Sequence, residues 1–229
     1  MKHISKREEP PGFTKWKGTI DTPWIPPQWD QMPRKIKDEL KRELVNEQGF
    51  ICCYCEKRIS ENICRSIEDD TCSHIEHIKP RSNPSYHEYI FDYNNLVSSC
   101  EGKRLLEQPS LHCGHFLNSW YDEKLFVSPL DPPCESLFVY TSLGEIRPAG
   151  NSAASEETIR RLGLNNKKLK KLRESVIEVV IQTEMQRSDP SSPDERELRR
   201  QRYSGRDESG KFQPFYSAIM QVLSIYQLI

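Results

Sequence analysis

Four cysteines have a spacing that could hold a metal ion. Cys52 and Cys55 form a Cys-x-x-Cys pair, and Cys100 and Cys113 follow further along the chain. A Cys-x-x-Cys turn presents two thiolates to one ion, and zinc prefers four tetrahedral ligands at about 2.3 Å from sulfur. The sequence therefore predicts a structural zinc held by these four cysteines, with His112 as the alternative to Cys113 for the fourth position.

A second group of polar residues lies among these cysteines, and it could hydrolyse a phosphodiester. That reaction needs a base for the attacking water and a cation for the added negative charge. His77 has the chemistry of the base, and Glu76 and His115 have the chemistry of ligands to a catalytic divalent ion such as magnesium. Asn95 offers both a donor and an acceptor, so we expect it to tie the base-bearing loop to the returning segment.

The elements that must position these groups are of mixed type. Apolar residues recur at every fourth position between residues 33 and 48, which predicts an amphipathic helix before the first cysteine pair. A strand is expected to carry the histidines at 74 and 77, and residues 137–140 are a second strand candidate. Residues 155–185 and 214–229 have helical patterning. The sequence predicts an α+β fold, with a last helix that docks on this protein's own core or on another chain.

We expect three regions in the 229 residues. Residues 1–32 are rich in proline and predict an extended arm, anchored by Trp16, Trp24 and Trp29. Residues 33–150 are expected to form the core that carries both sites. Residues 151–229 are expected to be helical, with an exposed polar linker at about 186–211.

The composition limits the class and location of the protein. No apolar run reaches the roughly 20 residues that span a bilayer, so we expect a cytoplasmic protein. In that reducing setting the eight cysteines are better interpreted as metal ligands than as disulfides. Cys64 and Cys72 have no partner at ligand spacing, and we expect them to be free thiols.

The charge of the chain restricts how it could bind nucleic acid. Its formal net charge is only -1, whereas contact with phosphates requires local Lys and Arg. The candidates for phosphate contact are Lys79, Arg81, Lys167, Lys168, Lys170 and Lys171. Because the whole chain is nearly neutral, we expect its activity to depend on a partner.

These motifs resemble those of a known family. The residues that carry the resemblance are Cys52-x-x-Cys55, Glu76-His77-Ile78-x-Pro80, Asn95-Leu96, Cys100 and Cys113-x-His115. Together they resemble the HNH endonucleases, whose ββα-metal site pairs a hairpin with a helix around one divalent ion. With Leu162-Gly163-Leu164-Asn165, the pattern is similar to the PtuB nucleases of Septu and retron anti-phage systems.

The resemblance implies a fold, an activity and partners. The fold is a zinc-stapled ββα-metal core with helical N- and C-terminal extensions, and the activity is metal-dependent cleavage of DNA or RNA. The implied partners are a PtuA-like ATPase and, in retrons, a reverse transcriptase and its msDNA. By the same resemblance His77 is the general base, Glu76 and His115 are metal ligands and Asn95 is the orienting residue.

One departure from the family pattern leaves a position open. Twelve residues separate Cys100 from Cys113, where many zinc-bearing relatives have a second Cys-x-x-Cys pair. The last HNH residue is therefore either His115 or Asn118. The alternative function is a catalytically inactive zinc-stapled subunit that binds nucleic acid or acts as a scaffold.

Overall fold

The computed structural model describes residues 1–20, 29–61, 71–100, 111–186 and 193–229. This part of the chain is a mixed α+β protein with two small antiparallel sheets. The strands are β1 (Ser73–His77), β2 (Leu96–Cys100), β3 (Phe138–Tyr140) and β4 (Ile146–Pro148). The α-helices are α1 (Pro11–Lys17), α2 (Arg34–Glu47), α3 (Gly114–Leu117), α4 (Ala153–Arg161), α5 (Lys167–Met185), α6 (Pro193–Ser204) and α7 (Tyr216–Ile225).

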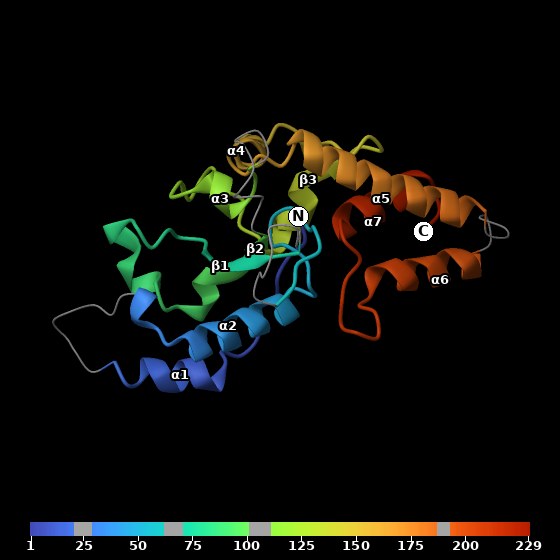
Figure 1. Ribbon diagram of the computed structural model, residues 1–229. Helices are drawn as coiled ribbons and strands as arrows, with labels where there is room; N and C mark the ends of the chain where they lie inside the picture. The colour runs from blue at the N-terminus through green and yellow to red at the C-terminus, as the bar shows by residue number, and fades with distance from the viewer. Residues whose placement is uncertain (21–28, 62–70, 101–110, 187–192) are drawn as a thin grey trace.

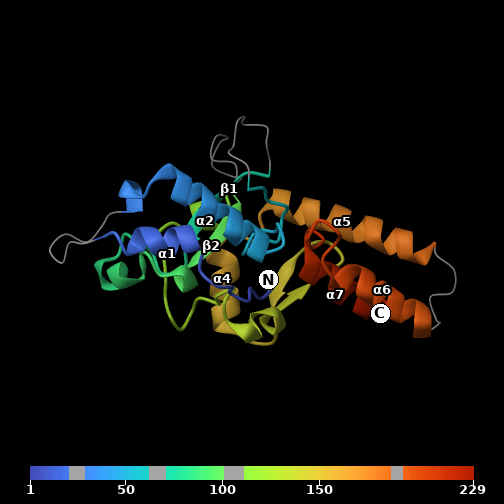
Figure 2. The same cartoon turned by 90° about the horizontal axis from the view of Figure 1, so that it is seen from below.

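The β1–β2 hairpin lies between two groups of helices. Helices α1 and α2 lie at one end of the molecule and α5, α6 and α7 at the other, as Figures 1 and 2 both show. Short 3-10 helices fill the connections, namely η1 (Trp29–Gln31), η2 (Pro84–Tyr89), η3 (Tyr93–Asn95) and η5 (Pro132–Leu137). The predicted helices at 33–48, 155–185 and 214–229 are confirmed as α2, α4 with α5, and α7.

The register of the hairpin determines which side chains share a face. His77 lies opposite Leu96, and Ser73 lies opposite Cys100. Because neighbouring side chains on a strand point to opposite faces, His74 and Glu76 share one face while His77 belongs to the other. Cys100 therefore ends β2 at the far end of the hairpin from His77.

The N-terminal arm is less extended than its proline content predicts. Proline is tolerated in the first turn of a helix, because the amide that it lacks would have no partner there. Pro11 uses this position to begin α1, from which Phe13 is fully buried and Trp16 packs on Phe91. Trp29 also packs on Phe91, while Trp24 lies outside the described residues.

Within the polar linker expected at about 186–211, residues 193–204 form the helix α6, so this part of the prediction is wrong, while residues 187–192 lie outside the described residues. Arg199 on this helix is fully buried, and its Nε lies 3.2 Å from Oε2 of Glu184 on α5. Arg202 and Tyr203 also donate to Glu184. A charge-rich composition suggested solvation, and most of α6 is exposed, but its Arg199 pairs with Glu184 inside the helical end of the molecule.

The last helix docks on this protein's own core. The Glu56 carboxylate, just after the first cysteine pair, accepts hydrogen bonds from the Ser217 amide and hydroxyl at 2.7 and 2.6 Å. Ala218 and Val222 on α7 are buried in the main core cluster. Helix α7 is thus attached to the same segment that carries Cys52 and Cys55.

The helices in the described ranges include none that is both long and apolar enough to cross a bilayer. The division into residues 1–32, 33–150 and 151–229 stays a prediction.

Candidate metal and catalytic sites

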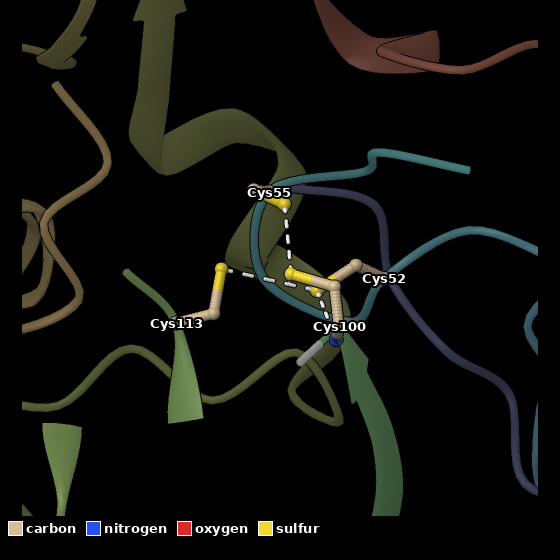
Figure 3. A group of neighbouring side chains, drawn as sticks. All are labelled: Cys52, Cys55, Cys100 and Cys113. Atoms are coloured by element: carbon tan, nitrogen blue, oxygen red, sulfur yellow. Dashed lines mark hydrogen bonds between the residues drawn. The ribbon is translucent and has the colours of Figure 1, made fainter. Parts of the chain in front are cut away.

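The four cysteines selected by spacing lie together in the core. Cys52, Cys55, Cys100 and Cys113 are all buried, and their sulfur atoms lie within 4.8 Å of one another. The Sγ atoms of Cys52 and Cys113 are 3.9 Å apart, and those of Cys55 and Cys100 are 3.7 Å apart (Figure 3). A tetrahedral zinc with bonds of about 2.3 Å places its sulfurs about 3.8 Å apart. The spacing of the donors fits zinc.

His112 lies beside this cluster. Its Nδ1 is 3.2 Å from the sulfur of Cys113 and 3.6 Å from that of Cys100. The amide of Cys100 also donates to the sulfur of Cys52, at 3.3 Å. The four sulfurs are the converging set, and His112 is placed to donate a hydrogen bond to them from outside.

The thiols of the cluster differ in acidity. Burial opposes ionisation of Cys55, but sulfur hydrogen bonds from Cys100 and Cys113 lower its pKa to about 6. Burial, together with the neighbouring thiolates, holds the pKa of Cys113 well above its usual range. The cluster without metal therefore mixes thiolates with thiols, and zinc binding releases the remaining protons.

A cavity of about 330 Å³ lies where β1 ends and α3 begins. The residues that line it include His74, Glu76, His77, Arg81, His115 and Asn118. Glu76 and His77 reach the same cavity from opposite faces because they are the last two residues of β1. Both candidates for the last HNH position, His115 and Asn118, line it as well.

Three of these side chains gather on one wall. Nε2 of His74 lies 3.2 Å from Oε2 of Glu76, and the rings of His74 and His115 have centroids 4.4 Å apart. The Tyr54 hydroxyl lies 3.5 Å from Oε1 of Glu76. Two imidazoles and a carboxylate are donors that suit a divalent transition metal. Their donor atoms converge less tightly than the cysteine sulfurs.

From the sequence, His74 is a further candidate near the catalytic centre, for which a structural or phosphate-contacting role is favoured over a role as metal ligand. The signal that could have selected it is its position two residues before Glu76, since residues at i and i+2 share one face of a strand.

His77 has a defined tautomer. Its Nε2 lies 3.0 Å from the carbonyl oxygen of Ile90. A carbonyl only accepts, so Nε2 carries the proton and Nδ1 of the neutral ring is a base. Burial lowers the pKa of His77 to about 4. The hydrogen bond to Ile90 favours the charged form and raises the pKa, but its effect is smaller than that of burial. The ring is therefore neutral at physiological pH.

Asn95 is buried and joins three backbone groups. Its Oδ1 accepts from the amide of Lys79 at 2.8 Å, and its Nδ2 donates to the carbonyls of Lys79 and Tyr89 at 3.1 and 3.0 Å. Lys79 follows the base by two residues, and Tyr89 precedes the Ile90 carbonyl that fixes its tautomer. Asn95 thus holds both segments that surround His77.

The predicted phosphate-contacting residues are distributed unevenly. Arg81 lines the cavity, with Asp30 at 3.5 Å, whereas Lys79 lies over the Tyr89 ring at 3.9 Å and outside the cavity wall. The four lysines between 167 and 171 lie at the start of α5 and do not line it. In the same basic segment, Arg173 is buried and donates to the carbonyl of Leu164, at 3.2 Å.

One cysteine differs from expectation. Cys72, predicted to be a free thiol, is disulfide-bonded. Cys64 lies outside the described residues.

The fold and its two clusters define a small α+β protein. A buried cysteine group fits zinc, and beside it a cavity is lined by histidines and a carboxylate. No protein-family model matches the chain. Over 152 residues it is 32% identical to a Vibrio cholerae serotype O1 biovar El Tor protein named "Retron Vc95 putative HNH endonuclease", and the match covers 64% of this chain and 67% of that protein. The chain belongs to the HNH endonuclease family.

Proposed function

We propose that this chain is a metal-dependent endonuclease that hydrolyses phosphodiester bonds of DNA or RNA. The observation that carries the proposal is the convergence of Glu76, His77 and His115 on one cavity. In this proposal β1, β2 and the single turn of α3 are the ββα-metal unit. We also propose that the chain divides into an N-terminal arm (residues 1–32), a nuclease core (33–150) and a helical C-terminal region (151–229).

His77 is the general base of the proposed reaction. Its Nδ1 accepts a proton from water, whose oxygen attacks the phosphorus while the bond to the leaving oxygen breaks. The Ile90 carbonyl keeps the proton on Nε2, and Asn95 holds the backbone on both sides. A low pKa keeps the base unprotonated, although it also makes the base weak.

Glu76 and His115 are the proposed ligands of a catalytic divalent ion, and His74 is close enough to join them. When bound, such an ion supplies charge neutralisation to the phosphate and the leaving oxygen. The four cysteines hold a structural zinc instead. They attach Cys113, and so the start of α3, to the end of β2 and to the turn at Cys52.

We further propose that the nuclease acts within a retron-type anti-phage complex. The relative's name connects that protein to a retron, and the sequence resembles PtuB nucleases. The proposed partners are a PtuA-like ATPase, a retron reverse transcriptase and its msDNA. The near-neutral charge of this chain supports a partner that contributes to substrate binding. The proposed phosphate contacts from this chain are Arg81, Lys79 and the four lysines of α5.

The test is cleavage of DNA and RNA pools by the complex, with and without divalent metal, for the wild type and His77→Ala. We expect the variant to lose cutting while it keeps zinc and assembly. Unchanged cutting by His77→Ala would contradict the proposed base. No cutting by the wild type under any metal would favour the inactive binding subunit. If the isolated chain cuts as fast as the complex, the dependence on a partner is wrong.

A further inference from the structure

The arm that precedes α2 reaches the proposed base. The rings of Trp29 and His77 meet edge to face, with centroids 4.5 Å apart and planes at 78°. The same indole stacks on Phe91, with centroids 5.9 Å apart and planes at 22°. Phe91 directly follows Ile90, whose carbonyl accepts from His77. Trp29 therefore contacts both the base and the segment that fixes its tautomer.

Trp29 is itself held in place by the core. Its carbonyl accepts from the Met32 amide at 3.3 Å, and Met32 is buried. Met32 packs in one cluster with Leu40 and Leu44 of α2, and Trp29 and Phe91 pack against this cluster. The indole is thus presented by the 3-10 turn η1, which packs through Met32 on helix α2 and can restrain a neighbouring ring.

The contact restrains a ring that has few other restraints. Among the described residues, His77 makes one side-chain hydrogen bond, through Nε2, and one ring contact, with Trp29. Rotation of the imidazole would take Nε2 away from Ile90 and allow the proton to move to Nδ1. An aromatic neighbour at this distance opposes such rotation, because edge-to-face pairs are favourable beyond the area that they bury.

We propose that Trp29 is a positioning residue for the general base. Its indole keeps His77 in the rotamer that bonds Ile90, so that Nδ1 remains the atom that accepts the proton of water. The assignment rests on the proposed function of His77. It gives the N-terminal arm a role in catalysis through a residue that does not itself touch the reacting atoms.

Trp16 provides a matched control. It belongs to the same arm and the same aromatic cluster, and it meets Phe91 edge to face with centroids 5.2 Å apart. The ring contacts of Trp16 are with Phe13 and Phe91, whereas those of Trp29 are with Phe91 and His77. Loss of general packing should therefore appear in both variants, and loss of positioning only at Trp29.

The experiment compares Trp29→Ala, Trp29→Phe and Trp16→Ala in the full chain within its complex. We expect Trp29→Ala to lower kcat about tenfold with little change in KM. This fold-change corresponds to the loss of one favourable aromatic pair together with a less well oriented base. Trp29→Phe should recover to within about threefold of the wild type, and Trp16→Ala should keep its kcat. Equal loss in Trp29→Ala and Trp16→Ala, or no loss in either, would overturn the assignment.

A second measurement does not depend on activity. Nitrogen-15 NMR of the zinc-loaded wild-type chain reports the tautomer of His77, and we expect the Nε2–H form. We expect Trp29→Phe to retain mostly that form. A wild-type spectrum dominated by Nδ1–H would overturn the positioning role. We expect Trp29→Ala to raise the Nδ1–H fraction of His77, and an unchanged Nε2–H population in that variant would also overturn the positioning role. If His77→Ala still cuts, the proposed function fails, whereas the comparison of wild type with Trp29→Ala by NMR still decides whether Trp29 holds the ring.

Discussion

A methyl group added at Gly114 would displace the carboxylate of Glu76. A Cβ built at this position would lie 2.6 Å from Oε2 and 2.8 Å from Cδ of Glu76. Carbon and oxygen in ordinary contact are about 3.5 Å apart, so the carboxylate must retreat by about 1 Å. Because the obstacle is the end of a side chain rather than backbone, the fold can accommodate the change.

The effects of Gly114→Ala on stability and activity should therefore separate. Alanine is favoured over glycine in helices by about 0.5–1 kcal/mol, so we expect the free energy of unfolding to change by no more than about 1 kcal/mol. A displacement of about 1 Å at a proposed metal ligand can cost up to about 100-fold in rate. We expect cleavage to fall about 10- to 100-fold and Mn²⁺ binding to weaken.

The assay combines cleavage rate, thermal unfolding and Mn²⁺ titration followed by electron paramagnetic resonance. Gly18→Ala is the control, because its new Cβ would lie 3.5 Å from the nearest atom, an ordinary contact, at a φ of -66°. Gly114→Ala that cuts as fast as the wild type would refute the reasoning that the position of Glu76 matters. A variant that loses zinc as well would show that the change reached the cysteine cluster instead.

Four other predictions concern pH, the two metals and the buried ion pair. The pKa of His77 is about 4 when folded and about 6.5 when unfolded. As pH falls from 6.5 towards 4, the unfolded chain binds this proton before the folded chain does, so the free energy of unfolding decreases. At pH 5 this protonation should lower the free energy of unfolding of the wild type by about 2 kcal/mol relative to neutral pH. Urea unfolding of the wild type and His77→Gln should show a smaller pH dependence in the variant. Cys100→Ser should lose zinc by elemental analysis and unfold at lower temperature, whereas Cys53→Ser, outside the cluster, should keep it; equal zinc in both would contradict the four-cysteine site. With His74 and His115 beside Glu76, Mn²⁺ should support cleavage at lower concentration than Mg²⁺, and a preference for Mg²⁺ would argue against imidazole ligands. Arg199→Leu leaves the Glu184 carboxylate without one of its buried partners and should cost about 3 kcal/mol by chemical denaturation, while exposed Arg200→Leu should cost less than about 1 kcal/mol.

Sequence patterns predicted the regular elements well where apolar period and boundary residues agreed. Helix α2 has Leu40 and Leu44 buried at the expected spacing, and it lies between Pro33 and Gly49. The α6 segment was not predicted as a helix, because it lacks such a regular apolar pattern. Its hydrophobic residues are few, and its burial depends on Glu184, a partner on another helix that no local pattern reveals.

The two sites differ in how far local spacing could describe them. Cysteines are few and zinc geometry is strict, so spacing alone selected the four that converge. The surroundings of His77 depend on contacts far apart in the sequence. Trp29 comes from the arm and Ile90 from the loop after η2, and no local sequence motif at either residue predicts that it contacts His77.

The sequence by itself determined the α+β class, the cysteine set and the residue types able to hydrolyse a phosphodiester, because these depend on local period and on the chemistry of single side chains. Only the tertiary structure decided that His74 joins Glu76 and His115, that His77 carries its proton on Nε2, and that the charged segment after residue 192 is a packed helix. Each of these depends on a partner distant in the chain. Distance and burial, which set hydrogen bonding and pKa, exist only once the chain has folded.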